Sequence, residues 1–261
     1  MYIEKEELQA QLYELKEQLQ IIESKIDKKN EKQKEFERVV LSQKQDNEIL
    51  KFQNDWLTLE NYELKILVIM GILAESNFAF RGKLDVICDW LGVKADTYNK
   101  NKIIKALEEL EKEEYIFYNI DKKVYTITIS EKAREQSEIT KILKQWIIVF
   151  KNYNRNEKGK VIDTNNSVDW INILKVFVFV YKNNCSEFTQ YELADILNIK
   201  GNDNKPSERI VSKALKAIKQ CKLENIELET ELLKRKYKDE KNITKWKTEG
   251  TRAKINYNFS E

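Results

Sequence analysis

The pattern that most constrains the fold of this chain lies in residues 61–130. Asn61–Ser76 carries apolar residues three and four positions apart, which predicts an amphipathic helix. Lys83–Trp90 predicts a shorter helix, and Gly92 follows it where a helix end favours a residue that tolerates positive φ. Asp96 then offers an N-cap for a third, longer helix. The segment therefore predicts three helices joined by short turns.

Two segments rich in aromatic, threonine and β-branched residues follow the third helix. Tyr115–Ile120 and Val124–Ile129 are separated by Asp121-Lys122-Lys123, which predicts a hairpin with a basic turn. Three helices followed by such a hairpin resemble the winged helix-turn-helix family. The resemblance implies a mainly α fold with small β wings, in which the domain binds either DNA or another protein.

The predicted third helix is polarised in charge. Its first part is rich in lysine, and its second part carries glutamates from Glu108 to Glu114. A recognition helix reads bases through its N-terminal residues, so this gradient is typical of DNA contact. Alternatively, lysine and glutamate simply solvate an amphipathic helix. The candidate DNA-binding residues of this helix and its hairpin are Thr97, Asn99, Lys100, Lys102, Lys105, Lys122 and Lys123.

Residues 169–261 repeat the plan with more positive charge. The predicted elements are a core helix at Trp170–Asn183, a short helix at Thr189–Leu197 capped by Thr189, and a longer helix at Pro206–Cys221. The last helix has one acid, Glu208, against Arg209 and three lysines, which makes it the most DNA-like helix of the chain. Its candidate contacts, with the loop before it, are Lys205, Arg209, Lys213 and Lys216.

The C-terminal end predicts a second basic hairpin. Ile226–Lys238 is ambiguous between helix and strand, while Ile243–Lys247 and Arg252–Phe259 flank a turn at residues 248–251. Such a hairpin beside a basic helix can hold phosphates on either side of a groove. Its candidate contacts are Lys234, Arg235, Lys245, Lys247, Arg252 and Lys254.

Residues 1–50 carry a heptad pattern. The a and d positions of its first half, which are the candidate dimerisation residues, are Leu8, Leu12, Leu15, Leu19, Ile22 and Ile26. One helix cannot bury such a stripe alone, so the pattern predicts a coiled coil and most simply a homodimer. The alternative is an amphipathic helix packed on its own neighbouring domain.

The predicted organisation has four segments. They are a coiled-coil helix at 1–50, a first winged-helix domain with a trailing connector helix at 51–150, a linker at 151–168 and a second winged-helix domain at 169–261. In the connector, Ser130 is the predicted cap of a helix whose apolar face runs from Ile139 to Phe150. The chain holds one proline and only six glycines, which indicates a helix-rich protein.

Composition excludes most catalytic sites. The chain has no histidine, which removes Ser-His-Asp and Cys-His catalysis and histidine metal ligands. Cys88, Cys185 and Cys221 form no CxxC pair, and the glycines form no phosphate-binding loop. We therefore expect no enzyme activity, no cofactor and no metal. Scattered cysteines, an acidic N-terminus and short apolar runs predict a reduced, cytoplasmic protein without a membrane segment.

Charge is unevenly distributed although the net charge is only +2. Residues 151–261 hold 22 basic and 16 acidic side chains, whereas residues 1–60 hold 10 basic and 14 acidic ones. A basic C-terminal half on a near-neutral chain is typical of a module that binds phosphates.

Two predicted winged helices behind a self-associating element resemble plasmid replication initiators of the two-winged-helix type. The terminal WKTEGTRAKINYNF is also similar to the closing hairpin of such proteins. The resemblance implies double-stranded DNA, namely origin repeats, as the ligand and host replication proteins as partners. Dimeric transcriptional regulators of plasmids or phages share most of these features. A coiled-coil scaffold with protein-binding winged helices is the alternative from another class.

Overall fold

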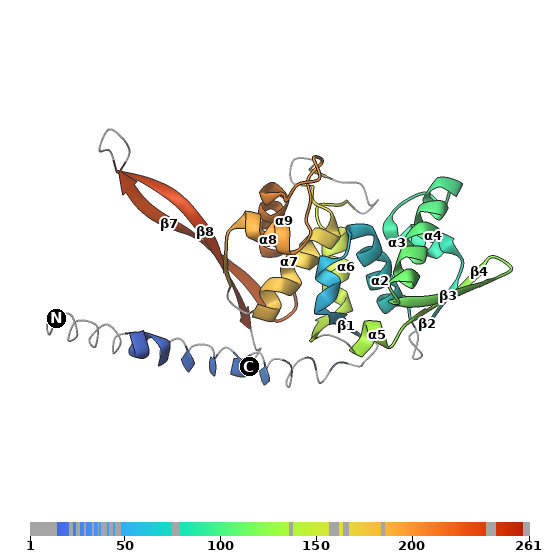
Figure 1. The fold of residues 1–261 in the computed structure, drawn as a ribbon, viewed down its shortest axis with the longest axis horizontal. Coiled ribbons are helices and arrows are strands. Elements are labelled where there is room, and N and C mark those ends of the chain that lie inside the picture. The colour runs from blue at the N-terminus through green and yellow to red at the C-terminus, as the bar shows by residue number, and fades with distance from the viewer. Residues whose placement is uncertain are drawn as a thin grey trace, which may run out of the picture. The chain divides into compact units, whose positions relative to one another are not determined.

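The computed structural model describes most of the chain from residue 48 onward. The described residues are 15–20, 48–74, 79–135, 138–156, 162–163, 167–183, 186–238 and 244–257, with isolated positions between 23 and 44; the side chains of 235–247 lie outside the description. The chain divides after Gln43 into two compact units. All helices and strands labelled in Figure 1 belong to the larger unit, Lys44–Asn258.

The first helix–hairpin assembly spans Asn61–Ile129. Its elements, in chain order, are α2 (Asn61–Leu73), β2 (Ala79–Gly82), α3 (Leu84–Leu91), α4 (Thr97–Lys112), β3 (Ile116–Asp121) and β4 (Val124–Ile129). The strands form an antiparallel sheet in the order β2-β4-β3. The short strand β2 was not predicted, because four residues show no alternation and the strand exists through its pairing with β4.

Local chemistry explains the turns of this assembly. Gly92 ends α3 at φ 72°, in the left-handed region that glycine tolerates. The side chain of Asp96 caps α4 by accepting a hydrogen bond from the backbone N–H of Asn99 at 2.9 Å. Lys122 and Lys123, at φ 48° and 67°, form the two-residue turn of the β3–β4 hairpin. These three predictions are confirmed.

The connector differs from its prediction. Ser130 does cap a helix, since its Oγ accepts a hydrogen bond from the N–H of Ala133 at 3.1 Å, but α5 covers only Lys132–Glu135. The segment Ile139–Leu143 is strand β5, and helix α6 begins at Lys144 and ends at Asn152. The reason is tertiary, because β5 pairs antiparallel with β1 (Ile49–Gln53), more than 80 residues earlier.

The second helix–hairpin assembly spans Trp170–Tyr257 and repeats the order of the first. Its elements are α7 (Trp170–Asn183), β6 (Ser186–Phe188), α8 (Gln190–Ile196), α9 (Glu208–Gln220), β7 (Ile226–Lys238) and β8 (Thr244–Tyr257). The strands again form an antiparallel sheet, in the order β6-β8-β7. Thr189 caps α8 as predicted, and Glu192 completes a capping box. Pro206 lies just before α9, whose N-cap is Ser207.

The predicted hairpin with a turn at 248–251 is wrong. Strand β8 continues through these residues and pairs with β7 along its length. Gly250 opposes Leu233 and Thr248 opposes Lys234, which leaves Glu249 as the extra residue of a β-bulge. A Cβ on Gly250 would lie 3.0 Å from the carbonyl oxygen of Phe188, so this glycine permits the close approach of β6.

The N-terminal prediction also needs correction. A coiled-coil helix does not extend to residue 50, because the chain enters β1 at Ile49. Residues 15–20 are helical, and Leu15 and Leu19 are 62% and 57% exposed rather than packed. The other four candidate dimerisation residues lie outside the described residues; they are Leu8, Leu12, Ile22 and Ile26.

The fold class is mixed α/β and not mainly α. Within the part of the chain that the structure describes, 53% is helix and 26% is strand, with three antiparallel sheets, which is not the predicted mainly α fold led by a coiled-coil helix. The strand content was underestimated because β1, β2, β5 and β6 pair with distant partners and carry weak local signals. None of the helices among the described residues is long and apolar enough to cross a membrane.

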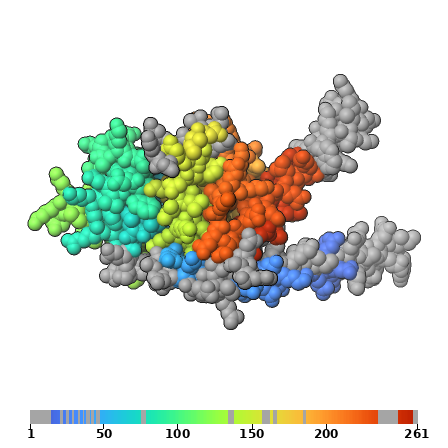
Figure 2. Space-filling view, turned by 180° about the vertical axis from the view of Figure 1, so that it is seen from behind, coloured from blue at the N-terminus to red at the C-terminus, as the bar shows by residue number. Residues whose placement is uncertain are grey.

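A shared core joins the two assemblies. Helix α6 packs on α7 through rings, with Trp146 at 5.4 Å from Phe177 and Phe150 at 5.1 Å from the same ring. Helix α2 of the first assembly also contacts α7. In Figure 2, the yellow-green segment around α6 lies between the two assemblies when the molecule is seen from behind. The two assemblies and the connector therefore form one packed body.

Candidate nucleic-acid interface

Helix α9 separates an apolar face from a cationic one. Its inner face buries Val211, Ala214, Leu215, Ala217 and Ile218 against the rest of the second assembly. Arg209, Lys213 and Lys216 follow one another by four and three residues, which places them on a common face away from that core. Arg209 and Lys216 are exposed, as is Lys205 in the loop before the helix.

Part of this cationic face is occupied by the chain itself. Lys213 is half-buried, and its Nζ donates to the carbonyl of Ser167 at 3.3 Å. Near the end of α9, the hydroxyl of Tyr153 donates to Oε1 of Gln220 at 2.7 Å. Arg209, by contrast, makes no hydrogen bond or ion pair with any residue that the structure describes. Among the predicted contacts on α9, exposed Arg209 therefore lies nearest the N-terminus, where a recognition helix reaches bases.

The base of the β7–β8 hairpin is balanced in charge. Arg252 of β8 bonds Glu187 of β6 at 2.6 Å and Glu231 of β7 at 3.2 Å. Lys254 is exposed and lies opposite Glu229 in the strand register. The predicted phosphate contact Arg252 is thus held between two carboxylates, which reduces its attraction for an anion.

The other predicted residues of this hairpin lie farther out. Lys234 is exposed at the bulge, opposite Thr248. Arg235 pairs in register with Lys247, and Lys245 lies opposite Tyr237. Their side chains, unlike those of Lys234 and Thr248, belong to the segment whose side chains are not described. The structure therefore brings Lys234, Arg235, Lys245 and Lys247 together at the outer part of one ribbon, and separates them from Arg252 and Lys254.

Three of the predicted contacts on the equivalent helix of the first assembly interact with other residues of that assembly. Lys100 pairs with Asp85 of α3 at 2.6 Å, and this hydrogen bond raises the pKa of Lys100. Nζ of Lys102 lies 4.5 Å from the centre of the Tyr62 ring, a cation–π distance. Asn99 donates from its side chain to the carbonyl of Lys94 at 3.0 Å.

The remaining candidates of the first assembly are exposed. Thr97 begins α4, Lys105 lies on its outer surface, and Lys122 and Lys123 form the hairpin turn. The structure therefore scatters these residues over the first assembly instead of gathering them into one cationic face. A sequence count of lysines could not show this, because the anions and rings that engage them lie on other elements.

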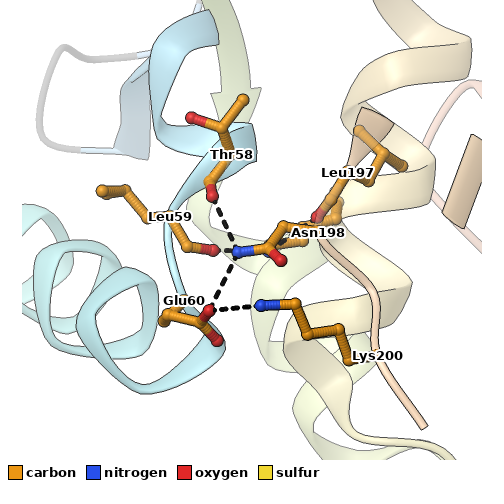
Figure 3. Close-up of polar contacts among 7 residues, drawn as sticks. Thr58, Leu59, Glu60, Leu197, Asn198 and Lys200 are labelled. Atoms are coloured by element: carbon orange, nitrogen blue, oxygen red, sulfur yellow. Dashed lines mark hydrogen bonds and ion pairs between the residues drawn. The ribbon is translucent and has the colours of Figure 1, made fainter. Parts of the chain in front are cut away.

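A polar junction between the assemblies escaped the sequence analysis. Figure 3 shows it beside the segment before α2, where Nδ2 of Asn198 donates to the carbonyl of Thr58 at 3.0 Å and to Oε1 of Glu60 at 3.2 Å. Lys200 bonds the same carboxylate at 2.8 Å, and this hydrogen bond lowers the pKa of Glu60. Two further pairs cross the junction, Lys65 with Asp169 and Asn61 with Asn172.

The centre of this junction is a fully buried lysine. Nζ of Lys175, on α7, donates to the carbonyl of Leu59 at 2.6 Å and to that of Leu197 at 2.8 Å. Burial lowers the pKa of Lys175 to about 8, against the attraction of Glu60. Lys175 therefore ties α7 to both assemblies. The one signal for it was a lysine inside the otherwise apolar run 173–180.

The cysteines and carboxylates do not form a reactive site in the described residues. Burial raises the pKa of the Cys88 thiol and raises that of Cys221 to about 11, so both favour the neutral thiol. Across the described part of the chain, no group of three His, Cys, Asp or Glu side chains could hold a metal ion.

Comparisons with family models, curated proteins and solved structures find no match to this chain. What can be inferred about function therefore depends on the geometry of its surfaces.

Proposed function

We propose that this chain is a non-enzymatic protein that binds double-stranded DNA and reads it with helix α9. The observation that carries the proposal is the asymmetry between two helices at equivalent places in the two assemblies. Helix α9 exposes Arg209 near its N-terminus on an acid-poor face, whereas Lys100 and Lys102 of α4 are engaged by Asp85 and Tyr62.

Arg209 has the chemistry for base recognition. Its planar guanidinium can pair bidentately with guanine in the major groove, a contact worth about 1–3 kcal/mol of discrimination. Lys205 and Lys216 suit phosphate oxygens, which position a protein on the duplex without specifying sequence. Arg209 and Lys216 share one face of α9, and Lys205 lies in the loop before it.

The test uses a matched pair of lysines. Lys216 and Lys105 are each the ninth residue after the N-caps Ser207 and Asp96, and both are exposed. Duplexes are first selected by the full chain from a random-sequence pool, and binding is then measured by fluorescence anisotropy at fixed salt. Arg209→Ala should weaken binding to the selected duplex about 5- to 150-fold more than binding to a scrambled duplex, from the discrimination energy above.

Lys216→Ala should weaken binding to both duplexes, and Lys105→Ala should weaken neither. If Lys105→Ala abolishes binding while Arg209→Ala does not, the first assembly is the reading head and the proposal has the wrong helix. If the unaltered chain binds no duplex, or nicks or hydrolyses one, the proposal of a non-enzymatic DNA-binding protein fails.

For the biological role we propose replication initiation on a plasmid or phage, with transcriptional regulation of a mobile element as the alternative. Both roles rest on the resemblance described above. A second copy of the chain and host replication proteins remain the predicted partners. Mapping selected sequences onto the source replicon separates the roles, since an initiator binds origin repeats and a regulator binds promoters. A protein-binding scaffold would instead show DNA affinity that does not change with salt.

A further inference from the structure

The β7–β8 hairpin is longer than the sheet to which it belongs. Strands β7 and β8 have 13 and 14 residues, but β6 pairs only with Thr251–Ala253 of β8. Ile226, Leu228, Ala253 and Ile255 are buried at the base, whereas Leu232 is already 53% exposed. In Figure 1 the two strands extend well beyond the helices of the second assembly. Packing on the core therefore ends near the bulge at Leu233 and Lys234.

Charge changes at the same point. The base segment, Ile226–Leu233 with Gly250–Tyr257, carries Glu227, Glu229 and Glu231 on exposed positions of β7, and Arg252 is paired with carboxylates. The outer segment, Lys234–Lys238 with Thr244–Thr248, contains no acid. Its basic residues are Lys234, Arg235, Lys236, Lys238, Lys245 and Lys247.

Such a concentration of cations is unfavourable for the ribbon by itself. The strand register places Arg235 opposite Lys247, and like charges directly opposite each other destabilise a strand pair. The buried apolar side chains described for this ribbon, Ile226, Leu228, Ala253 and Ile255, all lie in the base segment. A polyanion that binds the ribbon would remove the cost.

We infer that the outer segment binds the phosphate backbone of duplex DNA at a place separate from the α9 contact, with the charge-balanced base segment between them touching no phosphate. This inference rests on the proposed function and adds a second contact point to it. The five residues Lys234–Lys238 span about 16 Å of extended strand, enough to follow several phosphates. In the base segment the carboxylates offset the positive charge of Arg252 and Lys254, so this segment attracts phosphate weakly and the footprint has two parts.

The experiment compares two duplex lengths. One duplex is the sequence selected by the full chain, trimmed to the shortest that retains α9-dependent binding, and the other extends it by about 10 bp, one helical turn, on each side. The outer variant is Lys234→Gln, Arg235→Gln and Lys236→Gln. The control variant is Glu227→Gln and Glu229→Gln on the same strand. Circular dichroism checks that both variants fold.

The unaltered chain should bind the long duplex more tightly than the short one, and the outer variant should bind the two equally. The slope of log K against log salt on the long duplex should fall by about 3 in the outer variant, about 0.9 for each lost phosphate contact. The control variant should keep the length dependence and the slope.

An outer variant that keeps the length dependence and salt slope of the unaltered chain overturns the inference. If Arg209→Ala still weakens binding in that case, the proposed function stands without it. If the chain binds neither duplex but binds RNA or anionic vesicles through its outer segment, both the inference and the proposed function are wrong.

Discussion

Replacing Lys175 by methionine tests the buried junction between the assemblies. The lysine is fully buried and its pKa is lowered from 10.5 to about 8. In the unfolded chain the ammonium is solvated and ionises at its ordinary pKa. Below pH 8 the folded chain therefore holds a buried charge, and this lowers the free energy of unfolding by about 3 kcal/mol at pH 7, from about 1.4 kcal/mol per unit of pKa difference.

The sign of the pH dependence follows from that difference. As pH rises through 8, the folded chain releases the proton while the unfolded chain keeps it up to about pH 10.5. The unfolded state then binds more protons, so stability increases with pH, by about 2 kcal/mol between pH 7 and 9.5 from this group. Lys175→Met loses this increase. It also leaves the carbonyls of Leu59 and Leu197 without their donor, a cost of about 1–3 kcal/mol each.

Urea unfolding followed by tryptophan fluorescence at pH 7, 8, 9 and 9.5 measures the difference. The unaltered chain should gain stability relative to Lys175→Met by about 2 kcal/mol across this range. Lys200→Met is the matched control, because it removes the ion pair to Glu60 in the same junction but from a more exposed position. Its difference from the unaltered chain should change much less with pH, because Lys200 contributes less than burial to the lowered pKa of Lys175. Parallel curves for Lys175→Met and the unaltered chain would refute the reasoning.

Three further predictions concern local structure and assembly. Asp96→Ala removes the cap of α4 and should lower the free energy of unfolding by about 1 kcal/mol, measured by urea unfolding. Gly92→Ala should lower the free energy of unfolding by about 1–2 kcal/mol, because no atom lies near the added Cβ and only the φ of 72° is unfavourable. Gly250→Ala should lower it further, because the added Cβ would meet the Phe188 carbonyl. The predicted self-association through the N-terminal segment is tested by changing the exposed Leu15 and Leu19 to glutamate, which should lower the mass measured by light scattering. An unchanged mass would contradict self-association through these residues.

The two assemblies share one order of elements but differ in how their surfaces are used. In α4 the cations near the N-terminus are engaged by Asp85 and by the Tyr62 ring. In α9 the corresponding region exposes Arg209, and the occupied positions lie toward the other end. A chain with this asymmetry can dedicate one assembly to DNA and leave the other for structural support or for a protein partner.

The sequence by itself determined the elements whose causes lie within a few residues. The stripe of Leu64, Leu67 and Val68 predicted α2, and Asp96 marked the start of α4 because a cap acts on an N–H three residues away. The hairpin β3–β4 followed from its composition and its two-residue turn. The acid-poor face of α9 was also readable, because its residues repeat within one helix.

Only the tertiary structure decided what depends on distant partners. Ile139–Leu143 fits a helix by its apolar spacing and became β5 because β1 lies beside it, and Gly250 marked a close approach of β6 instead of a turn. Arg252 pairs with Glu187, sixty-five positions earlier in the chain, and Lys175 donates to the Leu59 carbonyl, 116 positions earlier. Periodicity and capping report on a few neighbouring residues, whereas strand pairing, ion pairing and burial depend on which segments the whole chain brings together.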